Sequence, residues 1–527
     1  MKEVLLALGP IVVLVILMTK AHPWPAYKAL PFAAFLMYLV KTIGFELEAN
    51  VANAVAFSGV FQAMTPILIV WGAIFLFSTM EHSGAMDVIR EMLATITGNK
   101  IGELMIIAWA FAFLVEGASG FGTPAALAAP ILVGLGFAPV RAALVCLVMN
   151  SVPVSFGAVG TPTWFGYQSL ELSHEMMLEI GAKSAIIHGV AALVIPVIAL
   201  RFATSWKEIR QNIVFIYLSI LSCVIPYVGL SFISYEFPTI IGGLIGLVIT
   251  VVLARYNIGL QKAEDFDSEK RVPAKKIIKA AFPLWGTVVV LVVTRIKQLG
   301  IKDMLIDMDP IFSFQLGSLG EISVARSLAL SMNGVFGVDG VGWQFKTLYV
   351  PSLIPFILVS LVSFVIFRMD KNQCGKVIRE SAGRMHLPAI ALFGALILVE
   401  LLRYGGDESC AAVIGSSLAK VLGPGWKFGA SFLGALGSFF SGSATVSAMT
   451  FGAIQQNAAI SLGLDPAAVL ASQSVGASMG NMVCIHNIVA VSTVVGLHHH
   501  EGYILKRTIW PMLVYGLIAG LVVSLMT

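Results

Sequence analysis

Charged side chains are scarce in this chain. Only 12% of its 527 residues are Asp, Glu, Lys or Arg, and 58% are hydrophobic, whereas about 25% of a soluble domain is charged. The composition therefore excludes a soluble globule and indicates a polytopic membrane protein surrounded by lipid. The formal net charge is only +4. The basic residues lie in loops rather than in one patch, so we expect no nucleic-acid partner.

Paired cysteines and most enzyme signatures are also lacking. The five cysteines have no C-x-x-C spacing, so neither a disulfide framework nor a metal-binding knuckle is indicated. No HExxH, Walker or aspartate-rich diphosphate motif occurs, which argues against an intramembrane hydrolase, a transferase or an ATP-driven pump. The run 498–501, HHHE, is interpreted as a surface loop. We therefore expect no enzyme activity, no cofactor and no metal.

Long apolar runs dominate what is present. Runs able to cross a bilayer, about 17–25 residues each, fall near 4–19, 29–45, 66–80, 182–202, 211–233, 237–255, 280–297, 347–367, 386–403 and 508–526. The broken segments 139–160 and 466–496 bring the count to about twelve crossings. The runs 103–137 and 426–463 have Gly-rich centres and are interpreted as re-entrant hairpins. The predicted fold class is an all-α polytopic membrane protein. The mixed connection 298–346 fits either an amphipathic segment on the outer side or a partial re-entrant segment, and the sequence leaves the choice open.

Residue identities recur at a constant spacing of 322 in the two halves of the chain. Gly72, Ala73, Leu76, Gly84, Ser119, Gly120 and Thr123 return as Gly394, Ala395, Leu398, Gly406, Ser441, Gly442 and Thr445. The shared glycines and the shared pattern of helix breaks indicate two structural repeats. The predicted organisation is N-terminal scaffold helices at 1–65, a first repeat at 66–202, central scaffold helices with basic loops at 203–385, and a second repeat at 386–527.

The basic loops set the predicted orientation. The loops 255–279 and 368–384 are rich in Lys and Arg, and such short loops stay in the cytoplasm. Counting crossings outward from them places both termini outside the cytoplasm. It also makes the two hairpins open to opposite sides, so the repeats are predicted to be inverted.

The hairpin tips are candidate binding sites. Glycine frees the backbone, Ser and Thr offer hydroxyls, and the returning helix presents free N–H groups and the positive end of its dipole, which together suit a carboxylate. The alternative is a pair of tight turns that only permit close packing. The candidate residues at the tips are Ser119, Gly120, Gly122, Thr123, Ser441, Gly442, Ser443 and Thr445.

The broken helices supply a second pair of candidate sites. Proline removes a backbone donor and frees a carbonyl about four residues earlier, and unwound points at mid-membrane in both repeats are typical of transport sites. A proline kink without a ligand is the alternative. The candidates are Asn150 and Ser151 beside Pro153 in the first broken helix, and Ser478 and Asn481 in the second.

Three ionisable residues within apolar segments are candidates for proton coupling. Burial favours the neutral form of a carboxyl group, which makes it a natural proton carrier. Glu116 lies three residues before the first tip, Glu400 in a helix of the second repeat, and His486 in the second broken helix. Structural alternatives are a hydrogen bond from Glu116 to the hairpin backbone, an ion pair between Glu400 and Arg403, and a satisfied core histidine.

The first repeat resembles a known family. The run 117–162, GASGFGTPAALAAPILVGLGFAPVRAALVCLVMNSVPVSFGAVGTP, and the preceding 72–89, GAIFLFSTMEHSGAMDVI, closely resemble the bacterial lactate permease family. The resemblance implies a proton symporter for L-lactate, and for D-lactate and glycolate, in the bacterial inner membrane. It also implies kinship with a wider ion-transporter superfamily whose members pair a scaffold with a mobile transport domain and often work by an elevator motion.

The second repeat departs from the pattern common in that family. The tip 441–448 lacks an acidic residue, and 479–487 lacks a lysine and a proline. Two alternatives to proton-coupled lactate uptake therefore stay open. One is a sodium-coupled or broader organic-anion carrier, and the other is an anion channel in which the tips form a selectivity filter. The sequence also leaves the oligomeric state open, including a homo-oligomer.

The orientation can be tested by cysteine labelling. Because the loops 255–279 and 368–384 are predicted to be cytoplasmic, cysteines placed at Gln261 and Asn372, in a variant without the native cysteines, should not react with an impermeant reagent in intact cells. They should react once the membrane is opened. Ready labelling in intact cells would overturn the orientation.

Overall fold

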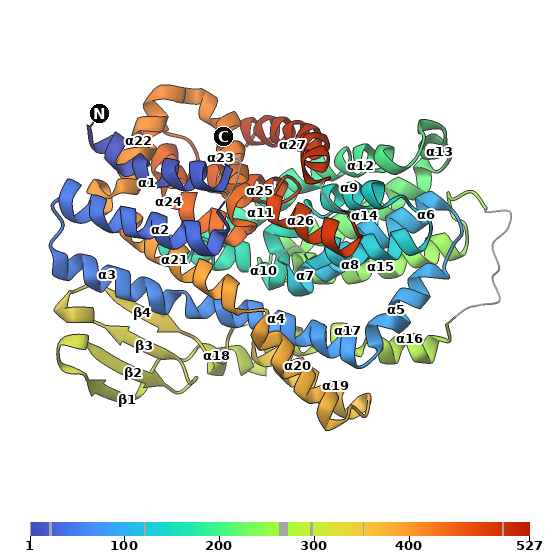
Figure 1. The fold of residues 1–527 in the computed structure, drawn as a ribbon, viewed down its shortest axis with the longest axis horizontal. Helices are drawn as coiled ribbons and strands as arrows, with labels where there is room; N and C mark the ends of the chain where they lie inside the picture. Colours follow the sequence, from blue (N-terminus) through green and yellow to red (C-terminus); the bar gives the residue numbers. More distant parts are fainter. Residues whose placement is uncertain are drawn as a thin grey trace. The chain divides into compact units, whose positions relative to one another are not determined.

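The structure is a computed structural model that describes residues 2–19, 24–120, 123–262, 272–295, 299–350, 353–497 and 500–526. The chain divides into two compact units, each built from two separate segments. Unit 1 comprises Met1–Ser83 and Phe282–Lys420, and unit 2 comprises Gly84–Ala281 and Val421–Thr527. Helices dominate both units (Figure 1). The chain thus passes from unit 1 to unit 2, back to unit 1, and finally to unit 2 again.

Unit 1 consists of helices and one small sheet. Its most extensive helix–helix contacts join α2 and α3 to α21. Glycines at these contacts let the helix backbones approach each other closely, as is typical of helices packed in a membrane. Its helices are α1 (Lys2–Thr19), α2 (Ala26–Leu39), α3 (Ala49–Gln62), α4 (Met64–His82), α17 (Phe282–Arg295), α18 (Ile301–Ile306), α19 (Ile354–Ile366), α20 (Lys371–Gly383), α21 (His386–Arg403) and α22 (Cys410–Leu422), and a π-helical turn (Val40–Gly44) extends α2.

The sheet of unit 1 is a correction to the all-α prediction. Four antiparallel strands follow one another in chain order, β1 (Pro310–Gln315), β2 (Glu321–Ala325), β3 (Leu330–Asn333) and β4 (Gly342–Phe345). They occupy the connection whose structure the sequence left open. Apolar and polar residues alternate along these short strands between glycine-containing turns, a pattern with the period of a strand rather than of a helix.

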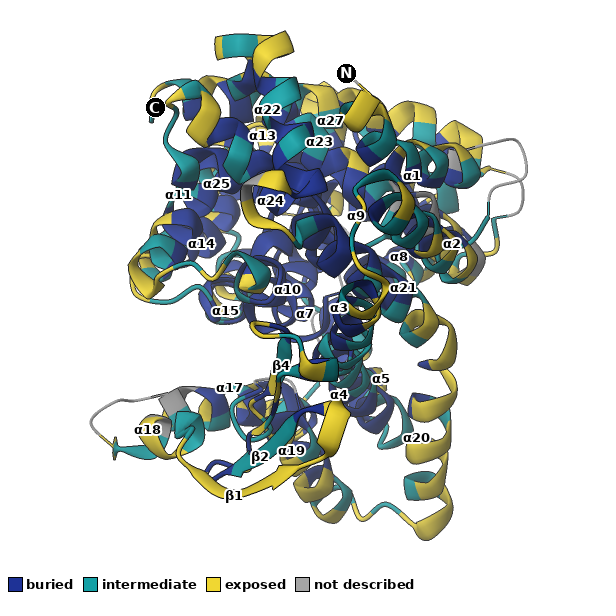
Figure 2. Ribbon diagram, turned by 90° about the vertical axis from the view of Figure 1, so that its left-hand side faces the viewer, coloured by how far each residue is buried: buried dark blue, intermediate teal, exposed yellow. Residues whose placement is uncertain are grey.

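The two faces of this sheet differ in polarity. The register places Phe312 opposite Val324 and Phe314 opposite Ile322, and it continues the same face through Met332. This apolar face also carries Leu330, Trp343 and Phe345. Helix α3 covers its β4 end, where the rings of Phe61 and Trp343 lie 5.2 Å apart. Strand β1 at the other edge is exposed along its length (Figure 2).

Unit 2 is entirely helical in its described residues. Its elements are α5 (Ala85–Ala94), α6 (Lys100–Leu104), η2 (Met105–Phe111), α7 (Ala112–Ser119), α8 (Thr123–Gly134), α9 (Pro139–Met149), η3 (Pro153–Phe156), α10 (Gly157–Trp164), η4 (Gln168–Leu170), α11 (His174–Ala192), α12 (Ile195–Ala203), α13 (Trp206–Gln211), α14 (Ile213–Ser231), α15 (Pro238–Arg255), α16 (Ala274–Ala280), α23 (Trp426–Ser441), η9 (Gly423–Gly425), α24 (Ala444–Leu462), α25 (Pro466–Gly480), α26 (Ile485–Val494) and α27 (Glu501–Ser524). Figure 2 shows α7, α10 and α25 among its buried elements.

Seven helices of the described chain are long and apolar enough to cross a membrane, or up to nine if each bent helix pair counts as one span. The two bent pairs are 139–149 with 153–170, at 61°, and 174–192 with 195–203, at 41°. The first of these is the broken segment that the sequence predicted. These spans are consistent with a multi-pass helical membrane protein, and the count of about twelve crossings remains a prediction.

Small residues determine how closely α23 and α25 pack. A Cβ atom at Gly476 would lie 1.9 Å from the carbonyl oxygen of Ser431, and one at Gly434 would lie 2.3 Å from that of Gln473. Both neighbours are backbone atoms, which cannot rotate away as a side chain would. The two helices therefore pack backbone to backbone, and any larger side chain forces them apart.

This packing predicts a stability difference between two glycine variants. Gly476→Ala should lower the melting temperature of the detergent-solubilised protein, because overpacking a tight contact costs about 1–3 kcal/mol. The control is Gly375→Ala on α20, where a Cβ meets no atom within 4 Å and alanine stabilises a helix by up to about 1 kcal/mol. Equal melting temperatures for the two variants would contradict the close contact.

Candidate functional site

The first turn of unit 2 ends helix α7. Gly120 follows Ser119 with a φ of 61° and a ψ of −155°, a conformation that glycine adopts and other residues almost never do. The Ser119 hydroxyl donates a hydrogen bond to the carbonyl of Val115, at 2.9 Å. Its hydroxyl therefore closes the helix end, while the glycine reverses the chain.

The second turn is built in a related way between α23 and α24. Gly442 has a φ of 71°, and the hydroxyl of Ser443 caps α24 by accepting the N–H of Val446. Ser441 donates to the carbonyl of Gly437, at 2.8 Å. Again one hydroxyl fixes the end of the first helix. The N-terminus of the 19-residue helix α24 is then free to present its first N–H groups.

The first helix break separates α9 from α10. Ala158 and Val159 have φ values of 44° and 54°, which cost about 1–3 kcal/mol each in residues that carry a Cβ. Thr161 donates its hydroxyl to the carbonyl of Ala158, and Ser151 donates to that of Val148, at 2.7 Å. Side-chain hydroxyls thus satisfy part of the backbone that the break leaves unpaired.

The second helix break lies between α25 and α26. Helix α25 ends at Gly480, and a short turn leads to α26. The side-chain nitrogen of Asn487 donates to both oxygens of Asn481, the backbone carbonyl at 3.2 Å and Oδ1 at 3.3 Å. This bond orients the Asn481 amide, and no described residue accepts a hydrogen bond from its Nδ2.

Both turns and both breaks meet around one small cavity. About 20 Å³ of it is open to the centre of a water molecule, which is room for one or two waters. Its wall consists of Glu116, Gly120, Val154, Gly157, Ala158, Pro162, Gly442, Ser443, Ala444, Thr445 and Asn481. Segments about 300 residues apart in the chain thus build a single pocket.

Among the described residues of this wall, Glu116 is the one carboxylic acid. Its side chain is 2% exposed, and its Oε2 accepts a hydrogen bond from Nδ2 of Asn150, at 3.0 Å. Gly157 leaves the space for the carboxyl group, because a Cβ there would lie 2.3 Å from Oε1. Oδ1 of Asn150 is buried without a described partner. The amide can therefore serve an ionised carboxylate as donor or, after turning over, a protonated one as acceptor.

The second turn and the second break contribute residues with hydrogen-bond donors to the cavity wall. Ala444 and Thr445 are the first residues of α24, so their N–H groups lack partners within the helix. The Thr445 hydroxyl has no hydrogen bond to another described residue, and the amide nitrogen of Asn481 adds a further donor. Together with the positive end of the α24 dipole, these groups form a site suited to a small anion.

The remaining predicted residues lie behind the wall or away from it. Ser119, Asn150, Ser151, Ser441 and Ser478 are bonded to neighbouring groups and do not line the cavity. Gly122 and the side chains of Thr123 and His486 are outside the described residues. Glu400 belongs to unit 1, where its carboxylate pairs with Arg403 at 3.1 Å.

Sequence reasoning missed the buried histidine of unit 2. His188 is 0% exposed and contacts Ser155 of the first break, which in turn contacts Ser474 and Ser478. A lone histidine within an apolar helix was the available signal.

Residues 476–480, GASMG, match the nucleophile pattern G-x-S-x-G. That pattern requires a strand-to-helix turn, whereas Ser478 lies within α25 and donates to the carbonyl of Ser474.

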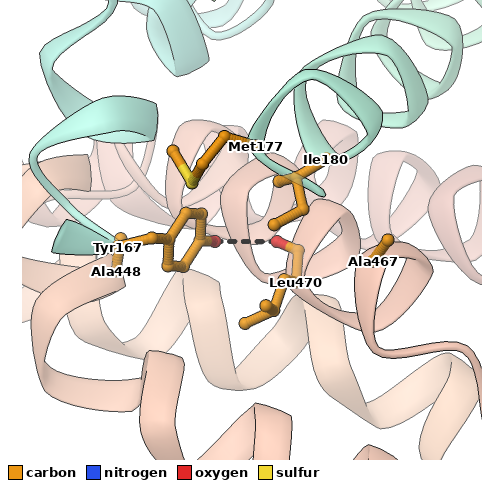
Figure 3. Packing of buried hydrophobic residues seen from close by; sticks show 6 residues of the cluster. All are labelled: Tyr167, Met177, Ile180, Ala448, Ala467 and Leu470. Atoms are coloured by element: carbon orange, nitrogen blue, oxygen red, sulfur yellow. Dashed lines mark hydrogen bonds between the residues drawn. The ribbon is translucent and has the colours of Figure 1, made fainter. Parts of the chain in front are cut away.

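Packing around the site also joins the two halves of the sequence. Tyr167, just after α10, donates its hydroxyl to the carbonyl of Leu470 at 2.7 Å. Figure 3 shows this bond within a cluster that adds Met177, Ile180, Ala448 and Ala467. Nearby, the Lys183 ammonium contacts Asp465, the residue that caps α25. No group of three metal-ligating side chains occurs among the described residues.

The apolar spans indicate a multi-pass membrane protein, and the helix breaks surround one internal cavity. The L-lactate permease family model matches residues 3–527. The chain therefore belongs to the L-lactate permease family, a family of transporters.

Individual relatives agree with this assignment. The chain is 48% identical over 521 residues to a Haemophilus influenzae protein named "Putative L-lactate permease", covering 99% of this chain and 98% of the relative. It is 26% identical to the L-lactate permease of Bacillus subtilis, over 89% of this chain and 86% of the relative. It is 24% identical to the glycolate permease GlcA of Escherichia coli, over 99% and 95%.

Two solved structures resemble the chain weakly. They are Neisseria gonorrhoeae MtrF, with a TM-score of 0.45 and 15% identity, and the Alcanivorax borkumensis YdaH transporter, with a TM-score of 0.43 and 16% identity. The alignments cover 100% of this chain and 95% and 97% of the two structures.

Proposed function

We propose that this chain takes up lactate together with protons across the bacterial inner membrane, and that glycolate and other small 2-hydroxy monocarboxylates share the route. Membership of a permease family and relatives named for lactate and glycolate support the substrate class. The observation that carries the coupling is the position of Glu116 in the same cavity wall as the N-terminus of α24.

The substrate carboxylate binds at the start of α24. N–H groups of the first helical turn and the Thr445 hydroxyl supply donors without a buried cation, as helix N-termini do for other anions. The amide nitrogen of Asn481 is then a donor for the 2-hydroxyl group or for the second carboxylate oxygen. A molecule with a carboxylate and a hydroxyl on adjacent carbons matches this short span of donors.

Proton and anion are coupled because Glu116 shares the cavity. Two negative charges about 5 Å apart repel by about 3 kcal/mol at an effective dielectric constant of about 20, which is roughly a hundredfold in affinity. A protonated Glu116 removes this repulsion, so each ligand strengthens the binding of the other. Asn150 supports both forms of the carboxyl group, since its amide can donate or accept.

The cavity is too small for lactate as it stands, so transport requires the wall to open. We propose about twelve crossings, with the two turns as the tips of re-entrant hairpins in inverted repeats. Unit 2, which carries the site, is then the mobile transport domain, and unit 1 is the scaffold of an elevator-like carrier. The two repeats at 66–202 and 386–527 and a homo-oligomeric assembly remain proposals of the same kind. Residues 203–281, which the sequence assigned to the central scaffold, belong in this proposal to the transport unit.

Glu116→Gln should separate exchange from coupled uptake. Glutamine mimics the protonated carboxyl permanently, so lactate counterflow in proteoliposomes should persist while accumulation driven by an acidic exterior should be lost. Glu103→Gln is the matched control, because Glu103 is a buried glutamate on the same span that does not line the cavity. It should retain both activities.

Other results of the exchange and uptake assays would assign a different role to Glu116 or a different mechanism to the protein. Accumulation by Glu116→Gln under a pH gradient would remove Glu116 as the proton carrier and direct attention to Glu400 and His486. A parallel loss of exchange and accumulation would indicate a structural role. Uptake by the wild type that requires sodium but no pH gradient would identify sodium coupling, and an absence of counterflow would identify a channel.

Thr445→Val should weaken lactate binding about tenfold or more, because a hydrogen bond to a charged group contributes about 1.5–3 kcal/mol. Gly442→Val should abolish binding by blocking the turn. Thr450→Val is the control, since the Thr450 hydroxyl donates to the carbonyl of Val446 on the same helix and does not line the cavity. Affinities are measured by displacement of labelled lactate. An unchanged affinity in Thr445→Val and Gly442→Val would move the site elsewhere.

A further inference from the structure

The cavity wall contains apolar side chains as well as polar ones. Among its described residues, those whose side chains cannot form a hydrogen bond are, apart from glycines, Val154, Ala158, Pro162 and Ala444. Each alanine contributes a single methyl group, and the ring of Pro162 is tied to the backbone of α10. Val154 is the remaining one, and this valine is 2% exposed. Its isopropyl group thus limits the apolar volume that the wall leaves to a ligand.

Val154 packs against the start of α24. It forms a cluster of buried residues with Ala444, the first residue of α24, and Ala477 of α25. Its backbone is held in the short turn η3, where the carbonyl of Val154 accepts the N–H of Gly157. A β-branched side chain is also restricted at χ1, so the two methyl groups do not readily turn away. The isopropyl group therefore occupies the space beside the helix end at which the substrate carboxylate is proposed to bind.

A bound 2-hydroxy acid would bring its second carbon to this place. Its carboxylate oxygens, bonded to the first N–H groups of α24, are two bonds away from that carbon, so the substituents of the carbon lie close to Ala444. The amide of Asn481 in the same wall suits the hydroxyl substituent. The alkyl substituent is then left with Val154, which packs against Ala444. Because the closed cavity has room for only one or two waters, each added carbon must displace part of the wall.

Val154 and Asn481 occupy corresponding positions in the two proposed repeats. The sequence LGFAP at 135–139 returns as LGLDP at 462–466, a spacing of 327 (462 − 135). The same spacing relates Val154 to Asn481 (481 − 154). Both residues line the cavity, one with an apolar side chain and the other with an amide. The two repeats thus contribute different chemistry from one position, which suits a carbon that carries both a methyl and a hydroxyl group.

We propose that Val154 is a specificity-determining residue, which contacts the methyl group of lactate and excludes longer or branched alkyl groups on the same carbon. The proposal rests on the proposed lactate transport and narrows its substrate class to 2-hydroxy acids with hydrogen or methyl as the alkyl substituent. One methylene group in an apolar pocket changes specificity by about 10–200-fold. The longer chain of 2-hydroxybutyrate competes with the valine for the space beside Ala444, so the wall does not close over it.

The test compares three acids of increasing length, glycolate, lactate and 2-hydroxybutyrate, as competitors of labelled lactate. The wild type should bind lactate about tenfold or more tightly than 2-hydroxybutyrate. Val154→Ala frees the space of two methyl groups, so this ratio should fall to about one. The ratio of lactate affinity to glycolate affinity should fall about fourfold, because the methyl group of lactate loses an apolar contact.

Val154→Ile should change the specificity in the opposite direction. Isoleucine adds one methyl group to the wall, which should weaken lactate about tenfold relative to glycolate. Val152→Ala is the matched control, since Val152 is a fully buried valine of the same break that does not line the cavity. It should keep the wild-type ratios. A ratio of affinities within one preparation does not depend on how much of the protein is folded.

Three results would overturn the role of Val154 and leave the proposed transport function standing. The first is a wild type that binds 2-hydroxybutyrate as tightly as lactate. The second is a pair of Val154 variants that weaken all three acids by the same factor, which means that the valine only supports the fold. The third is a Val152→Ala protein whose ratios change as much as those of Val154→Ala. A wild type that binds none of the three acids refutes the proposed function itself, and the specificity with it.

Discussion

Everything in this protein depends on the cost of an unpaired backbone group away from water. A chain inside a bilayer can leave the helical path only where protein covers it or a polar cavity satisfies it. Unit 2 places two turns and two helix breaks against one another at the cavity wall. Their hydroxyls, amides and free N–H groups satisfy one another in part. The first residues of α24, whose N–H groups lack partners within the helix, are among those that line the cavity.

This constraint explains why the sequence predicts several of the residues that line the cavity. Gly120, Gly442, Ser443, Thr445, Asn481 and Glu116 were expected as site residues from glycines, prolines and polar side chains in apolar runs, and all of them line the cavity. Such residues stand out because an uninterrupted membrane-spanning helix consists mainly of apolar residues and contains no turn. The same logic identified the bent segment around Pro153.

What the sequence could not supply was which partner each polar group would find. Ser119 and Ser441 look like ligands in the sequence, but both bond back to their own helices. His188 looks like an isolated core residue, yet its ring contacts both Ser155 and Tyr515, and Tyr515 lies 327 residues further along the chain. The sheet was missed because alternation over four to six residues is a weak signal beside long apolar runs.

The separation of the cavity wall in the sequence has a consequence for how the protein is made. The first break ends near Pro162, and the next segment of the wall begins at Gly442, 280 residues later (442 − 162). At a synthesis rate of about 5–20 residues per second, the first half waits roughly 15–55 s for the second. During that time α15 can already pack against α7 and the first break, but Glu116 and the unwound backbone lack the α24 and α25 part of the cavity wall. The insertion machinery, or water drawn into the nascent bundle, has to shelter them until α24 and α25 emerge from the ribosome.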